Sequence, residues 1–414
     1  MRKIALLPVL LLQFHLLLAQ SQAAKEENPL ETILKSNPAA FQHIINNKDS
    51  LRVQIVYTQI NRNRRNKASF REFPFNVQNN TYYYPASTVK MPIAFLALEK
   101  LNELNIPGLD MHSTMITDSS AESQDYVYTQ PHAIDGRPTI ANYIKQIFLV
   151  SSNDAFNRLY EFLGQEYIQR KLREKGYPDA IIRHRLQISR TSEQNASTNT
   201  IHFYDTSGNL LYSQPAQISK AVYPAVDASL GKGYISNGKL VKMPFSFNQK
   251  NRVYLQDFHH MIQSVMFPER TKRKKRFNLK DADYAFLRKW MGAYPEEVDF
   301  PKYDTGNTLT AGNKALYYGS GKQADPGIRI FNKIGGAYGF LVDVSYVMDL
   351  ENKVEYLLSA TISCNSDGIY NDDHYDYETV GYPFLKELGR AVHRYEIQRK
   401  RTHRPDLQPF VLQY

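Results

Sequence analysis

Ser87 and Lys90 stand three positions apart in the segment PASTVKMPIAFLA, where an apolar helical pattern begins. Residues spaced by three lie on one face of a helix, so this spacing places an amine beside a hydroxyl. A serine hydroxyl becomes a good nucleophile when a neighbouring base accepts its proton, and a lysine can do so when desolvation lowers its pKa. The N–H groups at the helix start would face a developing oxyanion. The pair therefore indicates nucleophilic attack on a carbonyl.

This spacing is not unique in the chain. Ser229–Lys232 and Ser236–Lys239 repeat it in a glycine-rich polar stretch that has no apolar helix behind it. A helix cap followed by a surface lysine would also account for Ser87 and Lys90 without any chemistry. The functional interpretation therefore depends on whether later segments of the chain carry matching residues.

Two later segments carry the other candidate residues. SSN at 151–153 opens the helical pattern SSNDAFNRLYEFLG, and KIGG at 333–336 ends a β-rich run. In chain order the three segments read Ser-x-x-Lys, Ser-x-Asn and Lys-x-Gly. This series resembles the active-site signature of class A β-lactamases and penicillin-binding proteins. The resemblance covers about residues 52–176 and 253–399, more weakly at the start of the second stretch, and matches 177–252 poorly.

The resemblance implies a catalytic role for three residues. Ser87 would attack a carbonyl and form an acyl-enzyme, and Lys90 would act as general base or hold the proton network. Ser151 would relay a proton to the departing nitrogen. Simple helix capping would also suit Ser151, and the two roles are compatible.

Four further residues would bind the substrate. Asn153 would bind a substrate amide and also Lys90, and Lys333 would place positive charge near the substrate carboxylate. Gly335 and Gly336 lie on the strand that carries Lys333, and the N–H of Gly336 would form the oxyanion hole together with that of Ser87. The resemblance implies no metal and no cofactor.

Two departures from the family pattern bear on the substrate. The family normally has Thr or Ser between the Lys and Gly of its third motif, where Ile334 stands and cannot donate a hydrogen bond to a carboxylate. Class A β-lactamases also carry a loop glutamate, with an asparagine four residues later, that activates the deacylating water. In the corresponding stretch, 183–199, the only glutamate is Glu193, followed by Asn195 at two residues and Ser197 at four. Glu193 is thus a candidate catalytic residue, and an exposed loop carboxylate is the simpler interpretation.

The elements that must position these residues can be inferred from hydrophobic periodicity. Strands are expected toward both ends of the chain, at 52–60 and 68–77 and in three runs after residue 327. Helices are expected between them, across most of 87–181 and at 253–267 and 282–292, and a final helix at 378–399. We therefore expect an α/β fold of the β-lactamase/transpeptidase type. An α+β sheet lobe from both termini (about 24–85 and 300–414) would carry an inserted all-helical lobe (about 86–299), with an insertion at about 177–252, in one domain.

The first residues are typical of an export signal. Arg2 and Lys3 precede an apolar run, Ile4–Leu18, and AQSQA then offers small residues for cleavage after Ala23. The run is shorter than the roughly 20 apolar residues that span a bilayer, although an uncleaved membrane anchor is the alternative. We expect a signal peptide at 1–23 and a periplasmic or secreted protein with no stable membrane span.

Composition and charge limit which classes of protein this chain can belong to. The chain has 414 residues, a net charge of +10 and 42% hydrophobic residues, which suits a folded protein. Its single cysteine, Cys364, excludes an internal disulfide framework and a multi-cysteine zinc site. Basic clusters at 62–67, 272–276 and 393–404 are interpreted as solvated faces, with contact to anionic envelope polymers as the alternative. The polar stretches 191–200 and 365–378 are interpreted as loops rather than metal sites.

These observations predict an exported serine hydrolase that acts through a Ser87 acyl-enzyme on an amide or ester, with hydrolysis of β-lactams as one option. The substrate would be a small molecule or derived from peptidoglycan, and nucleic acid is not expected as a partner. Two alternatives stay open: a DD-peptidase or penicillin-binding enzyme of cell-wall metabolism, and a non-catalytic envelope-binding module with this fold.

Overall fold

The structure of the protein is a computed structural model that describes residues 28–120, 125–225, 227–298, 300–302, 313–321, 323–325 and 327–411. The predicted signal peptide, 1–23, lies outside the described residues. Within them, no helix combines the length and the apolar character needed to cross a bilayer.

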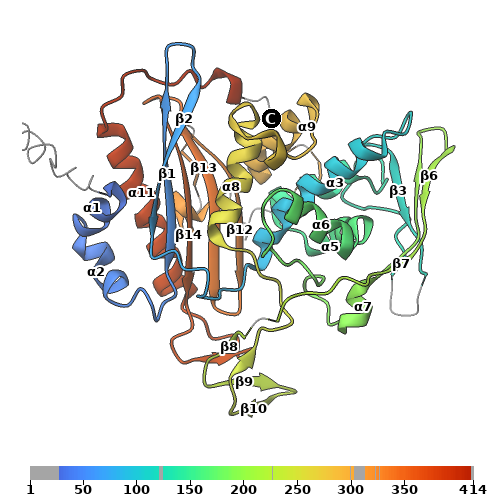
Figure 1. The fold of residues 1–414 in the computed structure, drawn as a ribbon, viewed down its shortest axis with the longest axis horizontal. Coiled ribbons are helices and arrows are strands. Elements are labelled where there is room, and N and C mark those ends of the chain that lie inside the picture. Colours follow the sequence, from blue (N-terminus) through green and yellow to red (C-terminus); the bar gives the residue numbers. More distant parts are fainter. Residues whose placement is uncertain are drawn as a thin grey trace, which may run out of the picture.

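One five-stranded antiparallel sheet forms the centre of the molecule, in the order β12–β13–β14–β1–β2 (Figure 1). Its strands are β1 (Gln54–Arg62), β2 (Ala68–Phe75), β12 (Ile328–Ala337), β13 (Phe340–Asp349) and β14 (Val354–Ser363). β13 and β14 are buried along nearly their whole length because helices cover both faces of the sheet. Segments from both ends of the chain therefore build one sheet, as predicted.

The helices α1 (Pro29–Lys35), α2 (Pro38–Asn46) and α11 (Tyr382–Gln398) pack together on one face of this sheet. The other face is covered by α8 (Leu255–Met266), while α9 (Asp281–Gly292) packs against β12. His259 ties α8 to the sheet, because its ring nitrogens lie 2.8 Å from the hydroxyls of Thr58 and Ser359. The sequence pattern predicts α8 in the inserted lobe, but its apolar face packs against β1, β13 and β14.

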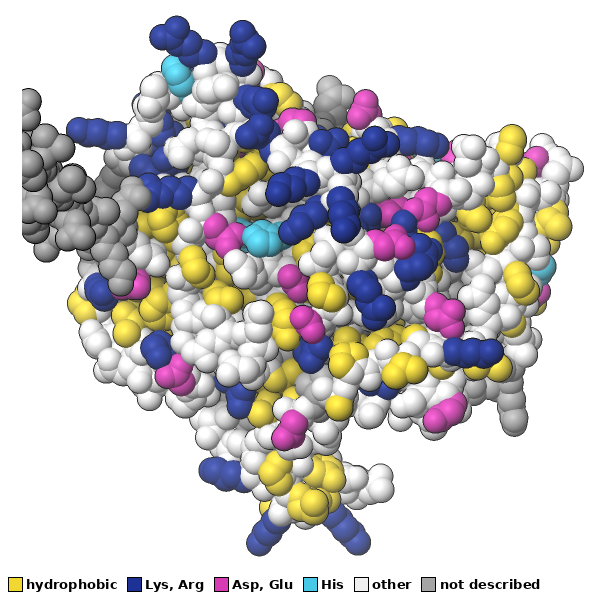
Figure 2. Space-filling view, in the orientation of Figure 1, with side chains coloured by type: hydrophobic (Ala, Val, Ile, Leu, Met, Phe, Trp, Pro, Cys, Tyr) yellow, Lys and Arg dark blue, Asp and Glu magenta, His cyan; other side chains and the backbone are white. Residues whose placement is uncertain are grey.

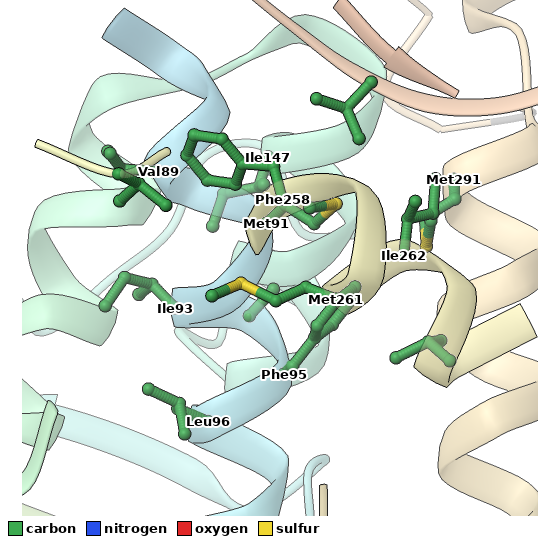
Figure 3. Close-up of a cluster of buried hydrophobic side chains, with 14 of the residues drawn as sticks. Val89, Met91, Ile93, Phe95, Leu96, Ile147, Phe258, Met261, Ile262 and Met291 are labelled. Atoms are coloured by element: carbon green, nitrogen blue, oxygen red, sulfur yellow. The ribbon is translucent and has the colours of Figure 1, made fainter. Parts of the chain in front are cut away.

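The inserted lobe is built around α3 (Lys90–Leu104), α4 (Ile140–Val150), α5 (Asn153–Leu163) and α6 (Gln165–Glu174). α3 is buried on all sides over most of its length, so its apolar residues do not form a single stripe. In Figure 3, Met91 and Phe95 of α3 lie against Met261 of α8, beside Ile147 of α4. This contact joins the start of α3 firmly to the sheet lobe.

The α/β fold class is confirmed, and the inserted lobe contains small sheets in addition to its helices. A three-stranded sheet joins β3 (Thr114–Thr117), β5 (Ile201–Tyr204) and β6 (Leu210–Gln214). The remaining short elements are α7 (Ser192–Ala196), α10 (Ala315–Tyr318), β4 (Ser197–Thr198), β7 (Gln217–Ile218), β8 (Ser229–Leu230), β9 (Gly233–Ser236), β10 (Lys239–Val241), β11 (Phe245–Ser246) and β15 (Ile369–Tyr370). Strands this short have too few residues to show alternation, so the sequence pattern missed them. The expected loop at 191–200 instead holds α7 and β4, since Thr191 caps a helical turn through the N–H of Gln194.

Candidate active site

Ser87 lies in a single 3-10 turn, Ala86–Val89, that leads directly into α3. Ala86 before it has a left-handed φ of 46°, and the Thr88 hydroxyl closes the turn by donating to the carbonyl of Pro85. A left-handed alanine is a conformation of raised energy, and it persists here because the surrounding core holds it. Val89 and Met91 are fully buried on either side of Lys90, so the nucleophile stands on a rigid support.

The two lysines and two serines of the three motifs meet at one point. Lys90 Nζ lies 2.9 Å from Ser87 Oγ and 3.1 Å from Ser151 Oγ, and it also donates to the carbonyl of Ser151. Lys333 Nζ, from β12, lies 2.9 Å from the same Ser151 Oγ. Ser151 presents its hydroxyl here because it ends α4 with a left-handed φ of 54°. A continuous chain of hydrogen bonds thus runs from Ser87 through Lys90 and Ser151 to Lys333.

Burial prepares Lys90 to accept a proton. Its side chain is fully buried, and desolvation, followed by the positive charge of Lys333, lowers the Lys90 pKa to about 6. At neutral pH the amine is therefore largely uncharged and has a free electron pair. That is the state in which a lysine can take the proton of a neighbouring hydroxyl.

Lys333 occupies a second buried cationic position. Desolvation lowers its pKa to about 7, and the carboxylate of Asp343 acts in the opposite direction. Asp343 is itself fully buried on β13, where burial raises its pKa while the Asn332 amide and the Leu316 N–H donate to it. Asp343 was not predicted from the sequence because an isolated acid within an apolar strand carries no motif.

Gly335 is required by the close approach of β12 to the nucleophile turn. A Cβ added there would lie 2.7 Å from the backbone N of Ser87 and 2.8 Å from both Pro85 O and Thr88 N. The next residue, Gly336, has room, since the nearest atom to an added Cβ is Leu341 Cδ1 at 3.5 Å. The strand that carries Lys333 is therefore pressed directly against Ser87, and the expected oxyanion donors belong to these two touching segments.

Among the described residues, no hydrogen bond joins Asn153 to Lys90, in contrast to the role that the resemblance implies. Its side-chain amide, at the start of α5, donates to Oε1 of Gln187. Gln187 is exposed and has a left-handed φ of 63°. The contact spans residues far apart in sequence, so the sequence alone did not single out Gln187. Its position beside the second motif makes it a further candidate residue, and its amide side chain cannot act as a base at neutral pH.

Glu193 is not brought to this cluster. Its side chain is exposed on α7, where its own backbone N–H and the Thr191 hydroxyl hydrogen-bond to the carboxylate and lower its pKa. It lines a cavity of about 410 Å³ together with residues such as Arg190 and Lys250, and none of the four residues of the hydrogen-bonded chain lines that cavity. Of the two interpretations of Glu193, its exposure on α7 fits the simpler one, a surface carboxylate, and the candidate role in deacylation is not supported by its position.

The structure also shows where Ile334 and the two other Ser-x-x-Lys segments lie. Ile334 is partly buried and packs against the hydrophobic cluster of the α11 face, while its carbonyl accepts from Lys333 Nζ at 2.8 Å. Ser229–Lys232 and Ser236–Lys239 lie in short strands and turns, without the buried lysine that distinguishes Lys90. In the described part of the chain, no group of three or more His, Cys, Asp or Glu residues is arranged to hold a metal ion.

Comparison with known proteins gives a family match and likenesses of fold. Residues 39–217 match the model of the "Beta-lactamase enzyme family", a stretch that holds Ser87, Lys90, Ser151, Asn153 and Gln187. A β-lactamase structure from Sphaerobacter thermophilus is 12% identical, covering 90% of this chain and 97% of that chain at a TM-score of 0.48. One from Burkholderia phymatum is 14% identical, covering 88% and 99% at 0.46.

PBP-A is also similar in structure, at 14% identity over 83% of this chain and 91% of that chain, with a TM-score of 0.43. No curated protein matches the chain. The predicted resemblance to the β-lactamase/transpeptidase-like serine hydrolases is thus confirmed over residues 39–217, the stretch that holds the first two of the three motifs.

Proposed function

We propose that this protein is an acyl-transferring serine enzyme whose nucleophile is Ser87. The observation that carries the proposal is the buried Lys90 amine, 2.9 Å from Ser87 Oγ, whose pKa is lowered to about 6. A surface lysine next to a helix cap would keep its charge and would be solvated. Here the amine is uncharged at neutral pH and faces the hydroxyl directly.

The reaction can be derived from these positions. As Ser87 Oγ bonds to the carbonyl carbon of an amide or ester, its proton passes to Lys90 Nζ and the carbonyl oxygen takes up the electron pair. When the C–N or C–O bond breaks, the proton passes through Ser151 Oγ to the leaving group, since this hydroxyl lies 3.1 Å from Lys90 Nζ. Lys333, 2.9 Å from the same hydroxyl, favours leaving groups or substrates that carry a carboxylate.

The second half of the reaction is expected to be slow. Water must be activated by a base to release the acyl group, and the side chain that contacts Asn153 is the amide of Gln187. Glu193 lies outside the cluster. We therefore favour a long-lived acyl-enzyme, the behaviour of a penicillin-binding or DD-peptidase type of enzyme, over a fast β-lactamase. This reverses the order of preference that the motifs alone suggested.

Labelling tests the nucleophile. A fluorophosphonate probe should add one equivalent to the protein by intact mass, and peptide mapping should place it on Ser87. Ser87→Ala should stay folded, because it removes a single side-chain hydrogen bond, the one accepted from Lys90 Nζ, which is worth about 0.5–1.5 kcal/mol, and it should take no label. Label on Ser229 or Ser236, or label that persists in Ser87→Ala, would refute the proposal and leave a non-catalytic binding module as the better account.

Export also belongs to this proposal. An enzyme acting on cell-wall material has its substrate outside the cytoplasm, and the N-terminal segment is typical of a signal peptide. In a Gram-negative host, the mature protein should begin at Ala24 in the periplasmic fraction. Full-length protein in the membrane fraction would contradict this.

A further inference from the structure

The cavity of about 410 Å³ beside α7 is separate from the hydrogen-bonded chain of the Ser87 site. Its walls come from the segments 183–196, 219–223 and 249–250 and from Gln165 at the start of α6. This volume is in the range of small-molecule sites, which are usually lined by apolar side chains. Here the lining is polar apart from Ile188, Tyr223 and two alanines, so a polar occupant is expected.

The charged side chains of this cavity are mainly cationic. The lining has one carboxylate, that of the exposed Glu193, and four cationic residues, Arg183, Arg185, Arg190 and Lys250. His184 adds no charge at neutral pH. Desolvation, and to a smaller extent the charges of Lys250 and Arg183, lower its pKa to about 4, while the hydrogen bond to the Arg185 carbonyl opposes this shift.

Two of the four cations already have a carboxylate partner. The guanidinium of Arg185 lies 3.2 Å from the buried carboxylate of Glu161. That of Arg190 lies 3.4 Å from the exposed carboxylate of Asp125. These two arginines are therefore neutralised within the protein and need no ligand.

The other two cations, Arg183 and Lys250, are in no ion pair between residues that the structure describes. The guanidinium of Arg183 lies over the ring of Tyr223, 4.7 Å from its centroid. Lys250 Nζ lies 3.2 Å from Tyr338 Oη. Both side chains are half-buried. These contacts hold the two cations at the cavity without cancelling their charge.

The walls also have hydrogen-bond donors to spare. Tyr223 Oη and Arg190 Nε are buried, and neither has a hydrogen-bond partner in the described part of the chain. Arg190 Nε can only donate, and a tyrosine hydroxyl can also do so. Unneutralised cations and unsatisfied donors together suit a ligand with negatively charged oxygens, because hydrogen bonds to such acceptors are the strong ones.

We propose that this cavity binds a small molecule that carries a carboxylate or phosphate group. Arg183 and Lys250 supply the positive charge, and the hydroxyls of Ser189 and Ser219 in the lining supply further donors. The proposal uses neither Ser87 nor its partners, so it does not depend on the proposed catalytic function. One wall belongs to the segment that also carries Gln187, and the occupant therefore lies beside that segment.

Calorimetric titration at constant ionic strength, with succinate, inorganic phosphate and succinamide as probes, tests this proposal. Succinamide has nearly the shape of succinate and lacks its charge. Succinate or phosphate should bind saturably, and succinamide should bind about tenfold or more weakly, because a neutral acceptor forms weaker hydrogen bonds. The tighter of the two anions assigns the ligand as a carboxylate or as a phosphate.

Three variants locate the bound anion. Arg183→Gln/Lys250→Gln should weaken binding ten- to a hundredfold, since bonds to charged groups are lost. Arg64→Gln/Lys67→Gln is the matched control and should change affinity by less than about twofold. It removes the same charge from exposed positions in the turn between β1 and β2, where Figure 2 shows Lys and Arg side chains at the top of the molecule, far from α7. Glu193→Gln should strengthen binding by up to about fivefold, and such a gain cannot come from misfolding.

A further variant separates this cavity from the Ser87 site. Lys333→Met should bind the anion as tightly as the native protein, and a loss of binding in it would place the anion at the Ser87 site instead. The proposal would also be overturned by equal weakening in the two double variants, which would mean attraction by net charge alone. No saturable binding of either anion, equal binding of succinamide, or no gain in Glu193→Gln would overturn it as well.

Discussion

Gln187→Glu should convert a slow acyl-enzyme into one that turns over. Glutamate has nearly the same shape as glutamine, so the left-handed φ of 63° is no more costly for the variant. Its carboxylate can accept the Asn153 amide N–H as Gln187 Oε1 does, and a bond to a charged acceptor is roughly twice as strong as a neutral one. The new side chain should therefore stay beside the second motif.

The expected gain comes from general-base catalysis. A positioned base contributes about 10²–10⁴-fold to a proton-transfer step, so deacylation should accelerate by this factor while acylation changes little. The exposed carboxylate is ionised at neutral pH and ready to activate water. We would form the acyl-enzyme with nitrocefin or an activated ester and monitor the loss of the adduct by intact mass.

Two variants serve as controls for this experiment. Gln187→Ala removes the partner of Asn153 without adding a base, and its deacylation should stay slow. Glu193→Gln removes the carboxylate that the sequence suggested, and it should deacylate like the native protein because Glu193 is exposed on α7. Deacylation by Gln187→Glu at the native rate, or a marked slowing in Glu193→Gln, would refute the assignment of this position.

Three further predictions concern the strand beside the nucleophile. Gly335→Ala should abolish labelling of Ser87 and destabilise the protein by about 1–3 kcal/mol, since its Cβ would lie 2.7 Å from Ser87 N. Gly336→Ala should be tolerated, because its Cβ would lie 3.5 Å from the nearest atom, Leu341 Cδ1, and equal effects in the two variants would contradict the geometry. Lys333→Met should raise stability by about 0.5–2 kcal/mol at pH 6, because the folded-state pKa is lowered to about 7. Between pH 7 and pH 10 the Lys333 amine is protonated in the unfolded chain but not in the folded one, so the stability of the native protein should rise with pH. The difference in Tm between Lys333→Met and the native protein should therefore shrink toward pH 10, and a difference that stays constant with pH would argue against a buried charge. Ile334→Thr should leave acylation by nitrocefin and by a neutral ester unchanged within about twofold, because the Ile334 side chain packs against the cluster of the α11 face while Lys333 points to Ser151; a ten- to hundredfold gain for nitrocefin alone would place this side chain at the bound carboxylate instead.

Much of the site was predictable because its residues sit where local patterns change. Ser87 and Lys90 open a helix, Ser151 closes one, and Lys333 lies in a β-run, so each motif has a local signature. The three motifs come together in space only because of the fold, and the fold class was indicated by the order of strands and helices along the chain. These positions were therefore accessible from periodicity and from family resemblance together.

The loop residues were not predictable in the same way. Gln187 reaches Asn153 through a chain path that depends on a left-handed backbone and on tertiary packing, and neither leaves a pattern in the sequence. Glu193 was a candidate only because it is the sole glutamate in its stretch, and it is exposed on α7, which agrees with the simpler interpretation as a surface carboxylate. The short strands within 177–252 likewise depend on pairing with distant segments, such as β9 with β15.

The most direct test of the account is the pH dependence of the rate at which a neutral fluorophosphonate labels Ser87. The base must be unprotonated to react, so a Lys90 pKa of about 6 predicts a rate that is low at pH 5, rises through an inflection near pH 6 and levels above pH 7. Lys90→Met should lose this rise together with most of the rate. A native rate that keeps climbing to pH 10, as for an ordinary solvated lysine, would contradict the claim that Lys90 activates Ser87.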